Sequence, residues 1–202
     1  MRCKPRRLSR RNDHGVVMVE AVIVTPIVML FLFFILEYGI VFKDYTSVGN
    51  AGSYASRAGA AAGDDTNADW QILQAINDNS AALARGDIQR IVVYSATDTD
   101  DTIGTVAPLC RTSATSIAGT CNIYRAADLS APVSRFGCDA VTDLDLAFCP
   151  SLRSTTLSPP AGPPSYIGIY IEYETSTLTN FFRRTFTFRS DSVTRLEPRR
   201  YS

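Results

Sequence analysis

Histidine, the side chain most often used in acid–base catalysis, occurs once in this 202-residue chain, whereas Asp and Glu together number 20. The single histidine, His14, lies in a basic N-terminal segment, so the rest of the chain has no imidazole. This argues against Ser-His-Asp and Cys-His catalysis and against histidine-based metal sites. Glu172 and Glu174 could form a carboxylate pair, because residues two apart on a strand share a face. No other feature supports a hydrolase, so we predict a protein without enzymatic activity or cofactor.

Four cysteines between residues 110 and 149 indicate disulfide chemistry. Ten residues separate Cys110 from Cys121, and ten separate Cys138 from Cys149. Four cysteines allow three connectivities, of which the symmetric spacing favours the two sequential pairs. A zinc site with four thiolates is the alternative, but no pair has the two- to four-residue gap of such sites. We expect Cys3, in the basic segment, to stay reduced.

Two other motifs could bind ligands. The acidic run that begins at Asp98 has Ile103 at its sixth position, where a calcium loop needs glycine, so we expect a solvated loop and no metal. Arginine and phenylalanine are interleaved over residues 181–188, FFRRTFTF, as in some proteins that bind single-stranded nucleic acid. The membrane topology inferred below makes nucleic acid an unsuitable partner for this segment.

Residues 16–36 form an apolar run with one charge, Glu20, and one proline, Pro26. A helix of this length spans about 31 Å, roughly the thickness of a bilayer core. Residues 1–15 carry six basic residues and one acidic residue, which places the N-terminus in the cytoplasm and the chain beyond about residue 42 outside. A cleaved secretory signal is the alternative, but its apolar region is shorter, about 7–15 residues.

Glu20 is the residue of this run that most needs an explanation. A carboxylate within a bilayer is costly and is usually functional, although one near the interface can extend towards water. Gly15 precedes Glu20 by five residues and follows a short basic leader, which is the pattern of a type IV prepilin. Cleavage after Gly15 would give Val16 a new α-amine and make Glu20 the fifth residue of the mature chain. A carboxylate from a neighbouring subunit could neutralise that amine, since each charge lowers the desolvation cost of the other.

The segment from residue 14 to residue 39 resembles the N-terminus of TadE-like proteins, which are pseudopilin-type components of the Tad (tight adherence, Flp pilus) system. The shared features are a basic leader, a glycine, a Val-Glu pair, a proline between two apolar runs and an acidic-aromatic-glycine end. The corresponding residues are Gly15, Val19, Glu20, Pro26, Glu37, Tyr38 and Gly39. The C-terminal residues 192–198 are also similar to the family.

This resemblance implies a minor pilin or pseudopilin of the bacterial cell membrane. Ala21 follows Glu20 where the major Flp pilin usually has tyrosine, and the chain is far longer than that pilin. The implied partners are other pilin subunits, a prepilin peptidase and, indirectly, an inner-membrane platform protein and an assembly ATPase. Gly15 and Val16 would be the processing site, and Glu20 and Pro26 would serve subunit assembly. The alternative function is an unprocessed, signal-anchored exterior binding domain.

The pattern of the whole chain predicts an α+β fold. A leader over 1–15 precedes a transmembrane helix over 16–42, and a helical stalk with a second helix over 43–86 leads into an exterior domain over 87–202. Residues 49–63 are mostly Gly, Ala and Ser, which lets a helix pack closely on a sheet or a neighbouring subunit. A flexible linker is the alternative for that stretch.

Within the exterior domain we expect an antiparallel sheet from residues 88–97, 166–175 and 186–196, with a short helix before the last strand. Helical spacing predicts a second helix over about 67–85, with a capping box from Thr66 to Asp69 and a core anchor at Trp70. Alternation over 166–175 indicates a strand buried on one face. A disulfide-bonded insertion of irregular structure fills about 98–164.

Overall fold

The computed structural model describes residues 14–80, 83, 87–96, 104–157, 163–177 and 184–198. The chain divides into two compact units, residues 1–40 and residues 41–202, and the helix α1 (His14–Ala62) contributes to both. Several segments named in the sequence analysis lie outside the described residues. They are most of the leader, the expected end of the second helix, the acidic run and most of the short helix before the last strand. The α+β class with one long N-terminal helix is confirmed.

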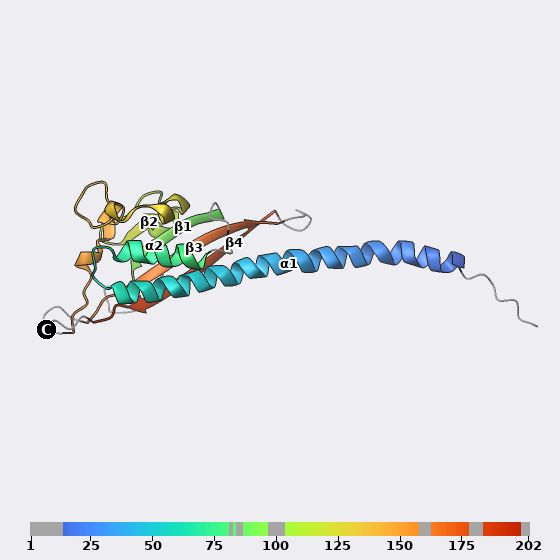
Figure 1. Cartoon of the computed structure of the whole chain (residues 1–202), viewed down its shortest axis with the longest axis horizontal. Coiled ribbons are helices and arrows are strands. Elements are labelled where there is room, and N and C mark those ends of the chain that lie inside the picture. The colour runs from blue at the N-terminus through green and yellow to red at the C-terminus, as the bar shows by residue number, and fades with distance from the viewer. Residues whose placement is uncertain are drawn as a thin grey trace, which may run out of the picture. The chain divides into compact units, whose positions relative to one another are not determined.

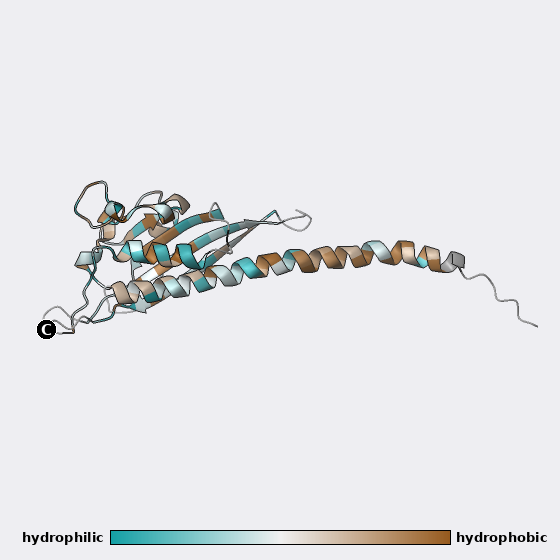
Figure 2. Ribbon diagram, in the orientation of Figure 1, coloured by the Kyte–Doolittle hydropathy of each residue, from teal (hydrophilic) through white to brown (hydrophobic). Residues whose placement is uncertain are grey.

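The first unit is the apolar part of α1. Large apolar side chains between Val17 and Leu36 are 47–75% exposed. The segment from Val17 contains the one helix of the described chain long and apolar enough to cross a membrane, judged by length and composition. Figure 2 shows apolar residues along this part of α1 and mixed hydropathy further along the helix.

The second unit is built on a four-stranded antiparallel sheet in the order β2-β1-β3-β4 (Figure 1). Its strands are β1 (Ile88–Ser95), β2 (Cys121–Tyr124), β3 (Tyr166–Ser176) and β4 (Thr185–Arg195). Three of them match the predicted strands to within two residues at each end. The expectation of a wholly irregular insertion was wrong at β2, because four residues are too few for a strand pattern to stand out from the sequence.

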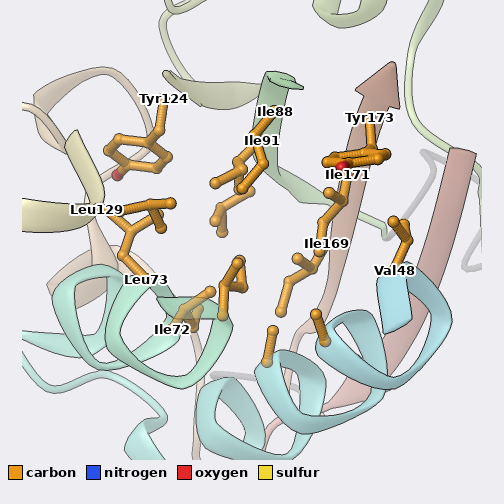
Figure 3. Packing of buried hydrophobic residues seen from close by; sticks show 14 of the residues in the cluster. Val48, Ile72, Leu73, Ile88, Ile91, Tyr124, Leu129, Ile169, Ile171 and Tyr173 are labelled. Carbon is orange, nitrogen blue, oxygen red and sulfur yellow. The ribbon is translucent and has the colours of Figure 1, made fainter. Parts of the chain in front are cut away.

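Residues 41–62 of α1 and the helix α2 (Ala68–Asn79) cover one face of the sheet. Val48, Ala51 and Ala55 of α1 are buried there, and Figure 3 shows Val48 near Ile169 and Ile171 of β3. The stretch of small residues is therefore a packed helix, and the flexible linker is excluded. Gly59 shows why this part of α1 needs small residues, since a Cβ at this position would lie 2.8 Å from Cδ1 of Ile167.

Two expectations about α2 were wrong. Its N-cap is Asn67, which makes no side-chain cap hydrogen bond, and Asp69 is completely buried instead of completing a capping box. The helix ends at Asn79, earlier than the spacing suggested. The role of Trp70 agrees with the prediction, because its ring packs against the core and its Nε1–H donates to the carbonyl of Ala131 at 3.3 Å.

The opposite face of the sheet is also covered in part. The short helix α3 (Pro108–Thr112) and the Cys110–Cys121 disulfide pack with Tyr94 and Tyr170 in a second cluster. β3 was expected to be buried on one face, but Tyr170 on its other face is only 2% exposed. The insertion causes this difference, since it folds back over that face.

A buried polar cluster fastens the insertion to α2. Asp69 accepts hydrogen bonds from Nδ2 of Asn122 at 2.8 Å and from the hydroxyl of Tyr124 at 2.6 Å. Arg153 places Nη2 2.7 Å from Oδ1 of Asp69 and donates to the carbonyl of Phe148 at 3.0 Å. Burial of the phenol is the main cause, and the nearby charge of Asp69 the second, that raises the pKa of Tyr124 well above its ordinary value. This phenol therefore remains a hydrogen-bond donor.

Within the described part of the insertion lie four short 3₁₀ helices: η2 (Ala126–Ser130), η3 (Val133–Arg135), η4 (Leu146–Phe148) and η5 (Pro150–Leu152). Asp145, just before η4, is buried and accepts the backbone N–H of Gly137 at 3.1 Å. Burial raises the pKa of Asp145 despite this hydrogen bond. Such side-chain contacts to the backbone, with the disulfides, order a segment that has few apolar residues of its own.

Candidate functional site

Gly15, Val16 and Glu20 all lie in the first turns of α1. Positions 16 and 20 are four residues apart, so they are neighbours on one helix face, about one turn or 6 Å apart along the axis. Glu20 is exposed, and so are the flanking side chains of Val19 and Val22. This arrangement presents one carboxylate within an apolar helix surface, near the start of α1.

Pro26 lies inside α1 six residues after Glu20. Proline has no N–H, so the carbonyl of Val22 loses the hydrogen bond that the helix would otherwise give it. The neighbouring Thr25 donates its hydroxyl to the carbonyl of Ala21 at 2.6 Å. A threonine hydroxyl that bonds to the backbone one turn earlier is a usual companion of proline in a membrane helix.

The four cysteines between residues 110 and 149 form two disulfides in the structure. Cys110 is joined to Cys121, which ties α3 to β2, and Cys138 is joined to Cys149, which closes the loop before η5. These are the sequential pairs that the symmetric spacing favoured. Cys110 and Cys121 are completely buried, so this disulfide is part of the second apolar cluster.

The carboxylate pair on β3 has structural neighbours of its own. Glu172 forms an ion pair with Arg189 of β4, with Oε1 3.0 Å from Nη2 and from Nε. Glu174 lies opposite Thr187 on the same strand pair. Among the residues that the structure describes, no group of three or more His, Cys, Asp or Glu side chains is placed to hold a metal ion.

The described chain is thus an apolar helix of membrane-spanning length that leads into a small α+β domain with disulfides. Residues 15–57 match the family described as TadE-like protein. This match confirms the resemblance inferred from the sequence, and it includes Gly15, Glu20, Pro26 and the first part of the small-residue stretch. A comparison with curated proteins and a comparison with solved structures each found no match.

Sequence reasoning missed the buried pair of Asp69 and Arg153. Asp69 stands near the start of a helix, where a carboxylate is usually a cap, and Arg153 lies in a segment without periodicity. Their pairing depends on how the insertion folds back onto α2. No local signal in the sequence marks either residue as buried.

Proposed function

We propose that this protein is a TadE-like minor pilin or pseudopilin, a non-enzymatic membrane component of Tad/Flp pilus assembly or of a related secretion apparatus. The observation that carries this proposal is the presence of Gly15 and Glu20, five residues apart, at the start of an apolar helix within the segment that matches the family. The match supports a pilus-related membrane protein, and the finer role is our inference.

Processing is the first step of the proposed function. A prepilin peptidase at the cytoplasmic side hydrolyses the amide between Gly15 and Val16. Water adds across this bond, so the leader ends in the carboxylate of Gly15 and the mature chain begins with the α-amine of Val16. Glycine suits this position, because a side chain would obstruct the close approach of the peptidase to the backbone. The helix that starts at Val16 stays in the membrane, since the cut lies before its apolar surface.

Assembly is the second step. The α-amine of Val16 is a cation at the end of an apolar helix, and burying it alone among helices is costly. Glu20 of a neighbouring subunit supplies the matching charge, so two subunits associate in one axial register. Pro26 leaves one backbone carbonyl without its helical donor, which makes this part of α1 easier to bend during packing.

The orientation of the exterior domain follows from charge and disulfides. The basic leader favours a cytoplasmic N-terminus, and two disulfides favour an oxidising compartment for residues beyond the helix. The proposed partners are other pilin subunits and the prepilin peptidase, with an inner-membrane platform protein and an assembly ATPase acting indirectly.

The intact mass of the protein extracted from its own membrane tests this proposal. We expect a chain that lacks residues 1–15 and keeps the apolar helix. A full-length chain would instead support an unprocessed, signal-anchored binding domain. Loss of the whole apolar run would mean a secreted protein, and either of these results would contradict the prepilin proposal.

A further inference from the structure

The two disulfides of the insertion differ in their exposure to solvent. Cys110 and Cys121 are completely buried in the apolar cluster that contains Tyr94, which shields both sulfurs from thiols in solution. Cys149 is 8% exposed, and Cys138 is half-buried and is followed directly by the exposed residues 139–142. Because thiol–disulfide exchange requires a thiolate to reach one of the sulfurs, Cys138 is the position that a second molecule can approach.

The backbone at Cys138 is held in an unfavourable conformation. Its φ is 63°, and in the described chain it is the one residue other than glycine with a positive φ. In this left-handed region the Cβ comes too close to the following carbonyl oxygen. The link to Cys149 and the bond from the N–H of Gly137 to Asp145 at 3.1 Å keep the segment in place. Opening this disulfide lets Cys138 leave that conformation, which favours its reduction over that of the buried one.

Ser151 lies beside the other sulfur of the exposed disulfide. Its Oγ is 3.1 Å from Sγ of Cys149, and the hydroxyl is the donor because a disulfide sulfur carries no hydrogen. When a thiolate attacks Sγ of Cys138, the S–S bond breaks and its electron pair leaves with Sγ of Cys149. The same hydroxyl can then donate to the new thiolate, which burial alone would destabilise. Cys149 is therefore suited to be the leaving group, and Cys138 to be the sulfur attacked.

Both ends of the loop that this disulfide closes have other anchors. The backbone N–H of Phe148 donates to Oδ1 of Asn122 at 2.8 Å, and the carbonyl of Phe148 accepts from Nη2 of Arg153 at 3.0 Å. Phe136 is 6% exposed, and its ring centroid lies 6.1 Å from that of Tyr124. One cysteine follows each phenylalanine within two positions, so opening the bond leaves the two thiols close together. The bond can therefore reform without refolding of the domain.

The charged side chains next to Cys138 in the chain are mainly acidic. Asp139 and Asp143 belong to the turn that follows, in which Asp143 accepts the backbone N–H of Asp139 at 2.9 Å. Arg135 precedes Cys138 by three residues. Two carboxylates against one guanidinium leave a net negative charge, which repels an anionic thiol and attracts a cationic one.

We propose that Cys138–Cys149 is an exchangeable disulfide, and that Cys138 forms a mixed disulfide with a protein dithiol whose attacking cysteine has basic neighbours. The first thiolate bonds to Sγ of Cys138 and releases Cys149, which takes a proton from solvent. The second thiolate of the partner then attacks the partner's first sulfur and releases Cys138, which is protonated in turn. The dithiol loses two electrons and, through solvent, two protons, and the cysteine pair of this chain gains them. Cys110–Cys121 stays intact, and the inference does not depend on leader processing.

Stepwise reduction of the full chain, extracted from its membrane in detergent, tests this selectivity. Dithiothreitol reduces the protein, iodoacetamide blocks the free thiols, and mass spectrometry of peptides measures the label at each cysteine. We expect Cys138 and Cys149 to be labelled at least about tenfold faster than Cys110 and Cys121, which react only after local opening. The fluorescence of Trp70 should keep its native spectrum during the first reduction. Equal labelling of both pairs, or loss of the native spectrum with the first bond, would overturn the proposal.

Small thiols of different charge identify the attacked sulfur. Cysteamine is cationic, 2-mercaptoethanol is neutral and 2-mercaptoethanesulfonate is anionic, and they are compared at equal thiolate concentration and low salt, with an acid quench. We expect the first adduct on Cys138, formed roughly threefold or more faster with cysteamine than with the sulfonate. Asp139→Asn should narrow this ratio. A first adduct on Cys149, or equal rates for the three thiols, would contradict the proposal.

A serine variant tests the leaving group. Ser151→Ala should slow formation of the adduct about fivefold, because the Cys149 thiolate loses a hydrogen-bond donor. Ser134→Ala, at an exposed serine of η3, is the matched control and should react at the normal rate. Urea unfolding of both variants should be unchanged, since neither alters the folded disulfide. An unchanged rate for Ser151→Ala would refute the assignment of Cys149 as the leaving group.

Discussion

Nη2 of Arg153 lies 2.7 Å from Oδ1 of Asp69, and neither side chain has any exposed surface. The pair joins the first turn of α2 to the end of the insertion, two segments 84 residues apart in the sequence. Asn122 and Tyr124 of β2 satisfy the other oxygen of Asp69. The ion pair therefore connects three elements through one carboxylate.

We predict that Arg153→Met destabilises the α+β domain by about 3–5 kcal/mol, because Asp69 becomes a buried charge without a counter-ion. The double variant Asp69→Leu with Arg153→Met should lose less than the sum of the two single changes. Urea unfolding, followed by the fluorescence of the single tryptophan, Trp70, measures each free energy. Glu172→Gln, at the ion pair with exposed Arg189, is the control and should change little. Additive effects at Asp69 and Arg153 would contradict the coupling.

The disulfides give a second prediction. Peptide mapping without reduction should recover Cys110 linked to Cys121 and Cys138 linked to Cys149. Replacing both cysteines of one pair by serine should lower the free energy of unfolding by about 3 kcal/mol, as expected for a loop of this length. A Cys110–Cys138 link would refute the pairing, and four free thiols would refute the exterior location.

Gly168 of β3 gives a third prediction. A Cβ at this position would overlap the ring of Tyr94 on the neighbouring strand. Gly168→Ala should therefore destabilise the domain by about 1–3 kcal/mol through overpacking. Gly104→Ala is the control, because its nearest atom would be 3.7 Å away. In a Tyr94→Leu background the cost of Gly168→Ala should fall, and an unchanged cost would show that the ring is not its cause.

Leader processing can be tested at the cleavage position. Gly15→Val should insert normally but run as a precursor about 15 residues heavier, since the valine side chain blocks the approach of the peptidase. Mass spectrometry of the membrane fraction measures the retained leader. Val17→Ile, two residues away, is the control and should be cleaved as usual. If Gly15→Val and the unaltered chain had the same mass, the prepilin proposal would be wrong.

Glu20 separates a pilin-like subunit from a plain membrane anchor. In an anchor, Glu20→Leu should be neutral or mildly helpful, because a carboxylate near the bilayer core disfavours insertion. In a pilin-like subunit it should be inserted and cleaved, yet fail to support pilus assembly, because the amine of Val16 loses its counter-charge. Counting assembled pili by electron microscopy, with Val19→Leu as control, measures the effect. Normal assembly by Glu20→Leu would remove the proposed role of this carboxylate.

The sequence predicted those parts of the fold that have a local pattern. Alternation marked β3, because burial of one strand face imposes a period of two on the chain, and the length of the apolar run marked α1. The burial of Asp69 could not be predicted in this way. Its environment is created by Arg153 and Asn122, which come from distant segments. The local sequence pattern instead favoured a capping role for Asp69.

The candidate site was predictable for a related reason. Gly15, Glu20 and Pro26 act within one helix, so their spacing in the sequence already fixes their spacing along the axis. The position of β4 at the edge of the sheet depends on strand order, which alternation does not define. The same residues would be a covered central strand if the order of the strands were different.

The hydrogen bond from the N–H of Glu197 to the carbonyl of Ala60 has a consequence for biosynthesis. The buried stripe of α1 at Val48, Ala51 and Ala55 is made early, but β3 and β4, which complete its surroundings, are synthesised more than a hundred residues later. During synthesis this stripe therefore lacks its sheet until nearly the whole polypeptide has been made. A chain released before residue 185 lacks β4 and the bond from Glu197 to Ala60, so only a nearly complete translation product can form the finished domain.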